Sequence, residues 1–165
     1  MPLPSTMIPI ATNTLSSASA TVTFSNIPQN YTDLVVVFNG LMTGASGMLL
    51  QLNSDTGANY SDTIMYGTGS AAVSMRDSNV SQIYAEATGG GTTNQHTQIF
   101  NFQNYSNTTT YKTVLIRNAK NVNEVGATVG LWRNTGAITT IRLFVSSNNF
   151  SSGSTFTLYG IKAAS

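Results

Sequence analysis

The sequence predicts an all-β protein, an antiparallel β-sandwich or barrel of about eight or nine short strands. Asn, Ser and Thr together make up 60 of the 165 residues, whereas charged residues make up only 8%. Short runs rich in Val, Ile, Thr and aromatic residues recur along the chain, and clusters of Gly, Asn and Ser separate them. Branched and aromatic side chains fit a pleated sheet and small polar residues fit turns, so the pattern is typical of strands joined by tight loops.

The N-terminal residues predict an extended arm in front of a single domain. Pro2, Pro4 and Pro9 favour extended backbone over a helix in this part of the chain. We therefore expect a short extended arm over residues 1–18 and one β-sandwich domain over residues 19–165.

Three apolar residues lie on this arm. Met7, Ile8 and Ile10 have no evident strand partner inside the domain, so we predict that they bind a partner protein. Each side chain would contribute about 1–3 kcal/mol if a partner buried it. The alternative is that the arm pairs with its own sheet as an additional edge strand.

The predicted strands share an apolar alternation, or a short apolar run, bounded by turn residues. In chain order they are residues 19–24, 32–40, 48–53, 96–105, 111–119, 124–134, 138–147 and 154–161. The nearly continuous apolar run at 32–40 predicts a central strand covered on both faces. Residues 54–72 have little periodicity and many turn residues, so we expect a long excursion at one end of the fold. Residues 79–87 fit either a ninth strand or a short helical turn, and the glycine-rich residues 88–94 predict a mobile loop.

Alternation in the last strand leaves the role of one glycine open. Phe156 and Leu158 share one face, and strict alternation places Gly160 with them and Ile161 opposite. A glycine bulge would return Ile161 to the core. Without a bulge, Gly160 gives room to a neighbouring segment.

Charge and composition exclude several classes of function. The net charge is +1 and the four arginines are scattered, so we expect no nucleic-acid partner. The chain has no cysteine, which excludes disulfides, thiolate metal sites and cysteine nucleophiles. No run approaches the roughly 18 apolar residues of a membrane span, so we expect no membrane insertion. The first residues also lack the features of a signal peptide.

No catalytic or metal-binding set of residues is recognisable. His96 is the only histidine and has no acidic neighbour in the sequence, so we expect a surface or edge-strand histidine. Asp55 and Asp62 lie close in sequence, but a glycosidase needs two carboxyl groups that face each other across a cleft. Residues 53–62 lack the spacing and the closing glutamate of an EF-hand loop. We therefore predict a protein that is not an enzyme and that has no metal site and no cofactor.

Aromatic residues near turns are candidates for carbohydrate recognition. Sugar sites often stack a ring on an exposed aromatic side chain, with Asn and Asp nearby to hydrogen-bond the hydroxyl groups. The residues that fit this pattern form a possible glycan-contact loop: Asp55, Asn59, Tyr60, Asp62 and Tyr66. For Trp132 we favour a core or rim position over a sugar site.

Three segments of the chain resemble small β-sandwich proteins of tailed bacteriophage virions. A turn of the form I-P-x-x-Y-x-D-L, at residues 27–34, leads into a hydrophobic strand. An N-x-D-x-G-x-N-Y-S stretch follows at residues 53–61, and an F-x-L-Y-G-I strand closes the domain at residues 156–161. With the strands between them, the resemblance spans most of residues 19–163, and its motifs are structural rather than catalytic.

The resemblance implies a jelly-roll-like β-sandwich on the exterior of a virion, usually a homotrimer. Capsid decoration (cement) proteins and tail-fibre modules both use such domains. A tail fibre normally carries a long N-terminal shaft, whereas only about eighteen residues precede the first clear strand here. We therefore expect a head decoration protein that stabilises the capsid, with the major capsid protein or other virion proteins as partners. The alternative is a tail-fibre or receptor-binding module that recognises a host surface glycan.

Overall fold

The computed structural model describes residues 6–86, 91–93, 95–120 and 124–162. In these ranges every regular element is a β-strand, which confirms the predicted all-β class. The strands are β1 (Met7–Thr14), β2 (Thr21–Phe24), β3 (Asp33–Gly40), β4 (Met48–Leu52), β5 (Tyr60–Gly67), β6 (Ala72–Val80), β7 (Ile83–Tyr84), β8 (His96–Phe102), β9 (Lys112–Lys120), β10 (Glu124–Trp132), β11 (Ile141–Val145) and β12 (Thr155–Ile161).

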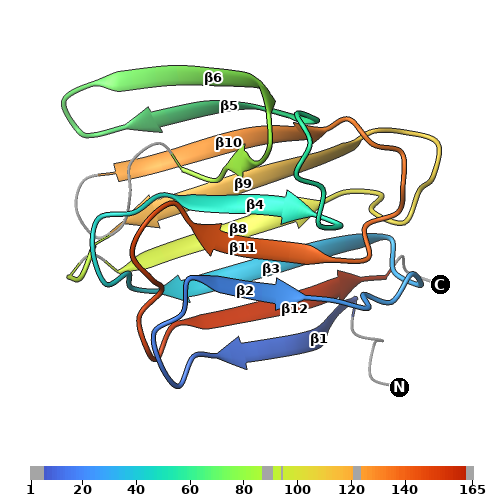
Figure 1. The fold of residues 1–165 in the computed structure, drawn as a ribbon, viewed down its shortest axis with the longest axis horizontal. Coiled ribbons are helices and arrows are strands. Elements are labelled where there is room, and N and C mark those ends of the chain that lie inside the picture. The colour runs from blue at the N-terminus through green and yellow to red at the C-terminus, as the bar shows by residue number, and fades with distance from the viewer. Residues whose placement is uncertain (1–5, 87–90, 94, 121–123, 163–165) are drawn as a thin grey trace.

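The strands form two antiparallel sheets that pack face to face as a sandwich (Figure 1). The large sheet has eight strands in the order β1-β12-β3-β8-β9-β10-β5-β6, and the small sheet has four in the order β2-β11-β4-β7. Eight of the eleven connections between consecutive strands cross from one sheet to the other. Such repeated crossing is typical of jelly-roll sandwiches, so the connectivity agrees with the predicted fold.

Three strands beyond the expected eight or nine are β1, β5 and β6. The expectation of a long excursion over residues 54–72 is wrong, because β5 and β6 form a hairpin that extends the large sheet beside β10. The inward side of β5 includes Asp62 between Tyr60 and Ile64, which interrupts the apolar alternation. Strand β6 is exposed along most of its length, so its sequence carries no apolar face.

The core lies between the two sheets, where their inward side chains interdigitate. Phe38, Phe150 and Phe156 form its largest aromatic cluster, with ring centroids 4.8–5.7 Å apart. Strand β3 is central, between β12 and β8, as the apolar run predicts. It is covered on one face only, because Val35 and Val37 point to the outward side and stay half-buried.

The predicted arm is extended, but it is paired rather than free. Strand β1 pairs with β12 as the outermost strand of the large sheet, so the alternative of an added edge strand is the one observed. The proposed boundary between an arm and a domain therefore does not separate Met7–Thr14 from the sheet. The first five residues of the predicted arm lie outside the described residues.

Gly160 is a buried position that makes room for a neighbour. The alternation of β12 continues through Gly160 to Ile161 without a register shift against β3. A Cβ atom at this glycine would lie 2.4 Å from the ring of Tyr31. The glycine therefore allows close approach of Tyr31, and the irregularity at this edge lies on β1, between Pro9 and Ala11.

Candidate interaction face

The outward side of β8, β9, β10, β5 and β6, which we call the open face, is covered by no other described strand. Cross-strand pairing sets its side chains in rows. One row runs Ile99, Arg117, Ala127, Met65 and Ser74, and the next runs Asn101, Leu115, Val129, Thr63 and Arg76. The strands are adjacent and in continuous register, so these rows form one surface.

Large apolar side chains stand exposed on this surface. Met65 is 52% exposed, Leu115 44%, Val125 65% and Val129 48%. Arg117 and Arg76 are the only charged residues at the outward positions of these five strands, and no carboxylate accompanies them. Five strands about 4.8 Å apart and about seven residues long cover on the order of 600 Å². That approaches the ~800 Å² that each partner gives to an interface of standard size.

The exposure of these residues follows from an inverted pattern in β10. Its outward positions include Val125, Val129 and Leu131, whereas its inward positions include Gly126 and Gly130. A Cβ atom at Gly130 would lie 2.6 Å from the Cδ1 atom of Ile83, so the small residue is required for packing under β7. Apart from Trp132, which is buried, the larger apolar residues of β10 therefore lie on the open face.

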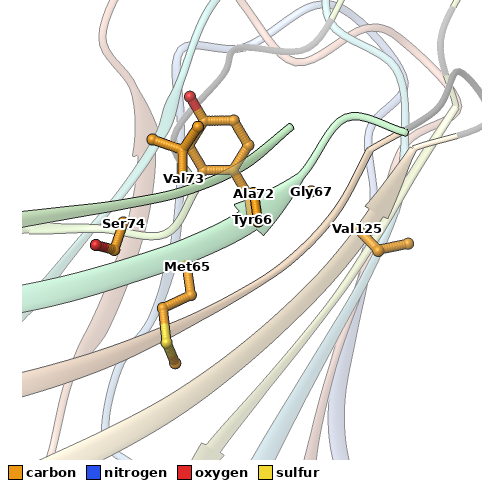
Figure 2. Close-up of a pocket in the computed structure, with 7 residues that line it drawn as sticks. All are labelled: Met65, Tyr66, Gly67, Ala72, Val73, Ser74 and Val125. Atoms are coloured by element: carbon orange, nitrogen blue, oxygen red, sulfur yellow. The ribbon is translucent and has the colours of Figure 1, made fainter. Parts of the chain in front are cut away.

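A shallow hollow lies on the open face, near the turn of the β5–β6 hairpin. Its floor is formed by Gly67, Ala72 and Ser74, and the larger side chains of Met65 and Val125 flank it. Figure 2 shows Met65 and Val125 on one side of the sheet, with Tyr66 and Val73 projecting from the other. The hollow is apolar and open to solvent, which suits an inserted apolar side chain better than a reacting substrate.

The outward side of the small sheet differs, because its large side chains contact one another. The guanidinium group of Arg142 lies over the ring of Phe144, at 4.3 Å from its centroid, and donates to Gln51 Oε1 at 2.8 Å. Gln51 in turn donates to the carbonyl of Ser81, and Leu49 beside it is 4% exposed. The large side chains on this surface are therefore covered by contacts with one another, whereas those on the open face remain exposed to solvent.

The structure does not bring the predicted glycan-contact residues together on a surface. Tyr60 and Asp62 are buried, so neither side chain is available to a sugar. The Tyr60 hydroxyl donates to the carbonyls of Leu52 and Asp55, and its ring stacks on Trp132 at 6.3 Å. Burial raises the pKa of Tyr60 to about 12.

Asp55 and Asn59 act inside the same loop. Asp55 Oδ2 accepts the indole N–H of Trp132 at 2.7 Å and the amide of Asn59 at 2.9 Å, and Oδ1 accepts the N–H of Gly57. Burial alone would raise the pKa of Asp55, but these three hydrogen bonds outweigh it and lower the pKa. Trp132 is buried, as the sequence indicated.

The two remaining acidic and aromatic members of the predicted loop lie on the inward side of β5. Tyr66 is half-buried opposite Val73 of β6. Asp62 accepts the N–H of Tyr84 at 3.0 Å and lies opposite Asp77. Burial raises the pKa of Asp62 to about 6, the hydrogen bond from Tyr84 opposes this shift, and the charge of Asp77 adds to it.

The three residues expected to bind a partner through the arm lie on β1. Met7 is exposed at the outer end of the strand, opposite Ile161. Ile8 is half-buried and lies opposite Gly160, and Ile10 packs against the edge of the core. Their strand partner is therefore β12 of the same chain.

The expectation of a surface or edge-strand histidine is wrong, because β8 lies between β3 and β9 inside the large sheet. His96 is 1% exposed and lies among buried charged residues at the end of β8. Its Nδ1 atom is 3.6 Å from Glu86 Oε2, and Lys120 Nζ is 3.5 Å from the same oxygen. Lys120 also pairs with Glu124 Oε1 at 3.0 Å. No local sequence pattern predicts this cluster, because its members come from four separate segments of the chain.

Within the described residues, no group of three or more His, Cys, Asp or Glu side chains is placed to hold a metal ion. The same part of the chain contains no helix that is long and apolar enough to cross a membrane. The sequence matches no protein-family model, and no curated protein matches it.

Proposed function

We propose that the protein is a non-enzymatic structural component of a bacteriophage virion and that it decorates and stabilises the head. The open face is the observation that carries this proposal, because it offers a broad apolar surface on a rigid sheet. The three virion-like sequence segments and the jelly-roll-like connectivity add support. The partner on the open face is then the shell protein of the head.

The chemistry of the open face suits a permanent contact better than a reaction. Met65, Leu115, Val125 and Val129 present exposed apolar area, and burial of each would contribute about 1–2 kcal/mol. Many copies on a shell would add through avidity, so a modest contact per copy is sufficient. Two arginines without carboxylates favour a partner surface of neutral or negative charge.

A homotrimer is part of the same proposal. Light scattering of the purified protein, or of protein released from particles, is expected to give three times 17.5 kDa, or a multiple of that mass where trimers associate. A monomer both in solution and on the particle would contradict it.

Binding to purified empty heads tests the proposed function. Val129→Lys introduces a charge at the centre of the open face and is expected to weaken binding about tenfold or more. Asn30→Lys, at an exposed loop position outside the open face, serves as the matched control and should bind as the unmodified protein does. Thermal melting checks that both variants stay folded.

Two outcomes would overturn the proposal. One is full affinity of Val129→Lys for heads. The other is that the unmodified protein binds host cells or their surface glycan and does not bind heads. The second outcome would favour the tail-fibre or receptor-binding alternative.

A further inference from the structure

We infer that the free edge of β6 pairs with β6 of a second copy of this chain, so that two large sheets join into one continuous antiparallel sheet. This inference rests on the edge of the sheet and is independent of the proposed place of the protein on a virion. It concerns the last strand in the order β1-β12-β3-β8-β9-β10-β5-β6. Figure 1 shows β6 at the margin of the molecule.

Strand β6 has the properties of an edge that is ready to pair. It is nine residues long, and among the described residues only β5 pairs with it. An edge strand presents a row of unpaired N–H and C=O groups, which natural proteins usually protect with proline, lysine or a bulge. Strand β6 contains neither proline nor lysine. Its charged residues are Arg76 and Asp77, and Asp77, which is the charge on the inward side, lies beyond the stretch from Ala72 to Arg76. Its one irregularity lies opposite the Tyr60/Ser61 step, near its C-terminal end, so the stretch from Ala72 to Ser78 is regular.

The opposite edge of the same sheet is protected. Strand β1 carries Pro9, which has no N–H to donate, and its register shifts between Pro9 and Ala11. Both devices disrupt a regular pairing edge. A contact between copies therefore favours β6 over β1.

The side chains of β6 also favour pairing with the sheet edge of a second copy. Val73 is 37% exposed and Met75 45%, and both lie on the inward side of the sheet, opposite Tyr66 and Ile64. Figure 1 shows that β4, β11 and β2 overlap the middle strands of the large sheet, whereas β6 lies beyond them. Val73 and Met75 thus form an apolar strip that the small sheet leaves uncovered.

Charge and side-chain direction select one register for the pair. In a continuous antiparallel sheet the two copies are related by a two-fold axis perpendicular to the sheet, so outward residues face outward residues. A pair centred on Ser74 places Val73 opposite Met75 of the second copy, twice. Ala72 then faces Arg76, and the two Arg76 side chains stand about 13 Å apart along the strands, beyond the ~8 Å screening length at physiological salt.

Other registers are less favourable. A pair centred on Arg76 would oppose two guanidinium groups, and one centred on Asp77 would oppose two carboxylates. A pair centred on Met75 would place Val73 opposite Asp77. The second copy is therefore the occupant that fits this edge, in the register centred on Ser74.

The absence of cysteine from the chain allows a direct test of that register. Ser74→Cys places one thiol in each copy at directly opposed positions, where Cα atoms about 4.5–5.5 Å apart permit a disulfide. Mild oxidation of this variant should give a band at twice 17.5 kDa on a denaturing gel. If trimers also form, the denaturing gel still shows a dimer, because each chain has one thiol. Light scattering of the undenatured protein then gives the mass of a larger assembly.

Matched controls separate specific pairing from random collision. Thr97→Cys lies exposed in the middle of the large sheet, and Thr12→Cys lies exposed on β1. Both should cross-link about tenfold more slowly than Ser74→Cys. Equal rates for Ser74→Cys and Thr97→Cys would overturn the inference, and so would fastest cross-linking at Thr12→Cys.

A second substitution tests the edge itself. Met75→Lys, added to Ser74→Cys, brings a charge into the apolar strip and should slow cross-linking about tenfold. Ser78→Lys lies on the same strand outside the paired residues and should leave the rate unchanged. Equal rates with and without Met75→Lys, at unchanged melting temperature, would contradict pairing through β6. Neither result depends on whether the protein binds heads.

Discussion

The two ends of the β9–β10 ladder each bury a lysine, and the two lysines are stabilised in different ways. Lys112 pairs in register with Trp132 at one end, and Lys120 pairs with Glu124 at the other. At the first end, neutral hydrogen-bonding groups and one half-exposed carboxylate satisfy the buried polar atoms. At the second end, buried carboxylates and a histidine surround the lysine. The comparison therefore contrasts a buried lysine stabilised by hydrogen bonds to carbonyl groups with a buried lysine stabilised by ion pairs.

The Trp132 end is well satisfied. Lys112 Nζ donates to the carbonyls of Thr110 and Thr135 at 2.7 and 3.0 Å, and burial lowers its pKa. Trp132 donates to Asp55, and Tyr60 bonds the backbone of Leu52. Hydrogen bonds of this kind contribute about 0.5–1.5 kcal/mol each, and more where a charged group takes part.

The Lys120 end leaves polar atoms without partners. Glu86 Oε1 accepts the N–H of Met48, whereas the contacts of Glu86 Oε2 within the described part of the chain are the longer ones to Lys120 and His96. Among the described residues, both ring nitrogens of His96 and the amide atoms of Gln98 lack hydrogen bonds. Buried polar atoms without partners are costly, so we expect this end to respond more strongly to pH and to loss of charge.

The largest expected effect is at the satisfied end. Trp132→Ala removes the largest fully buried side chain and the donor to Asp55, so the free energy of unfolding should fall by about 3–5 kcal/mol. Trp132→Phe keeps most of the apolar volume and should cost about 1.5–3 kcal/mol, mainly through the lost hydrogen bond to a charged acceptor. Urea unfolding monitored by circular dichroism measures both. Equal losses for the two variants would show that the hydrogen bond, which both variants lose, and not packing dominates this end.

A matched pair of lysine substitutions tests the comparison directly. Lys120→Met removes the cation that pairs with Glu86 and Glu124 and should lower the free energy of unfolding by about 3–5 kcal/mol at pH 8. Lys112→Met removes hydrogen bonds to two carbonyls and should cost about 1–3 kcal/mol. Urea unfolding of both variants at one pH gives the ranking. A larger loss for Lys112→Met would reverse the comparison.

The pH dependence of stability should separate Glu86 from His96. Burial raises the pKa of Glu86 from its usual 4.5 to about 7, although Lys120 opposes the shift. The folded protein therefore holds a proton that the unfolded chain releases, and this contribution is lost as pH rises through 7. Burial and Lys120 lower the pKa of His96 from 6.5 to about 4, so its contribution is lost as pH falls from 6.5 to 4.

The two contributions oppose each other between pH 4.5 and 6.5, so single substitutions should reveal them. Glu86→Gln should become less stable as pH falls through this window, and His96→Asn should become more stable. Melting temperatures from pH 4.5 to 7 measure both slopes. Burial also raises the pKa of Asp62 to about 6. Asp62 is present in both variants, so its contribution cancels in the difference between their slopes. A difference between the two slopes that is zero, or opposite in sign to the expected one, would contradict these assignments.

The smallest expected effect is at Asp55. Hydrogen bonds from Trp132, Asn59 and Gly57 lower its pKa against the effect of burial, so its carboxylate stabilises the fold at neutral pH. Asp55→Asn should lower the free energy of unfolding by about 1 kcal/mol at pH 7. The difference from the unmodified protein should shrink as pH falls below 3.8, where the carboxylate takes up a proton. A difference that stays constant with pH would show that charge at Asp55 is not involved.

The sequence predicts the elements whose apolar alternation faces the core. Val22 and Phe24 of β2, and Phe156 and Leu158 of β12, are buried as their spacing indicates. The hairpin of β5 and β6 was not predicted, because β6 buries few side chains and so lacks an apolar alternation in its sequence. Strand β6 was missed because its side chains are mostly exposed, and not because the segment forms a turn.

The candidate surface escaped prediction for a related reason. In β10 the apolar residues Val125, Val129 and Leu131 face outward, while glycine occupies inward positions. Alternation reports that two faces differ but does not say which face lies inside. The buried position of His96 depends on contacts between distant segments, which a local pattern does not contain.

The order of strands has a consequence for the time course of folding during synthesis. Strand β12 lies between β1 and β3, and β11 lies between β2 and β4. Each sheet therefore keeps a gap between its earliest strands until residues 141–161 have left the ribosome. The nascent chain carries several unpaired strand edges during that interval, and such edges are prone to aggregation. Completion of the fold is expected to be late and slow, because the contacts that close each sheet join residues far apart in the chain.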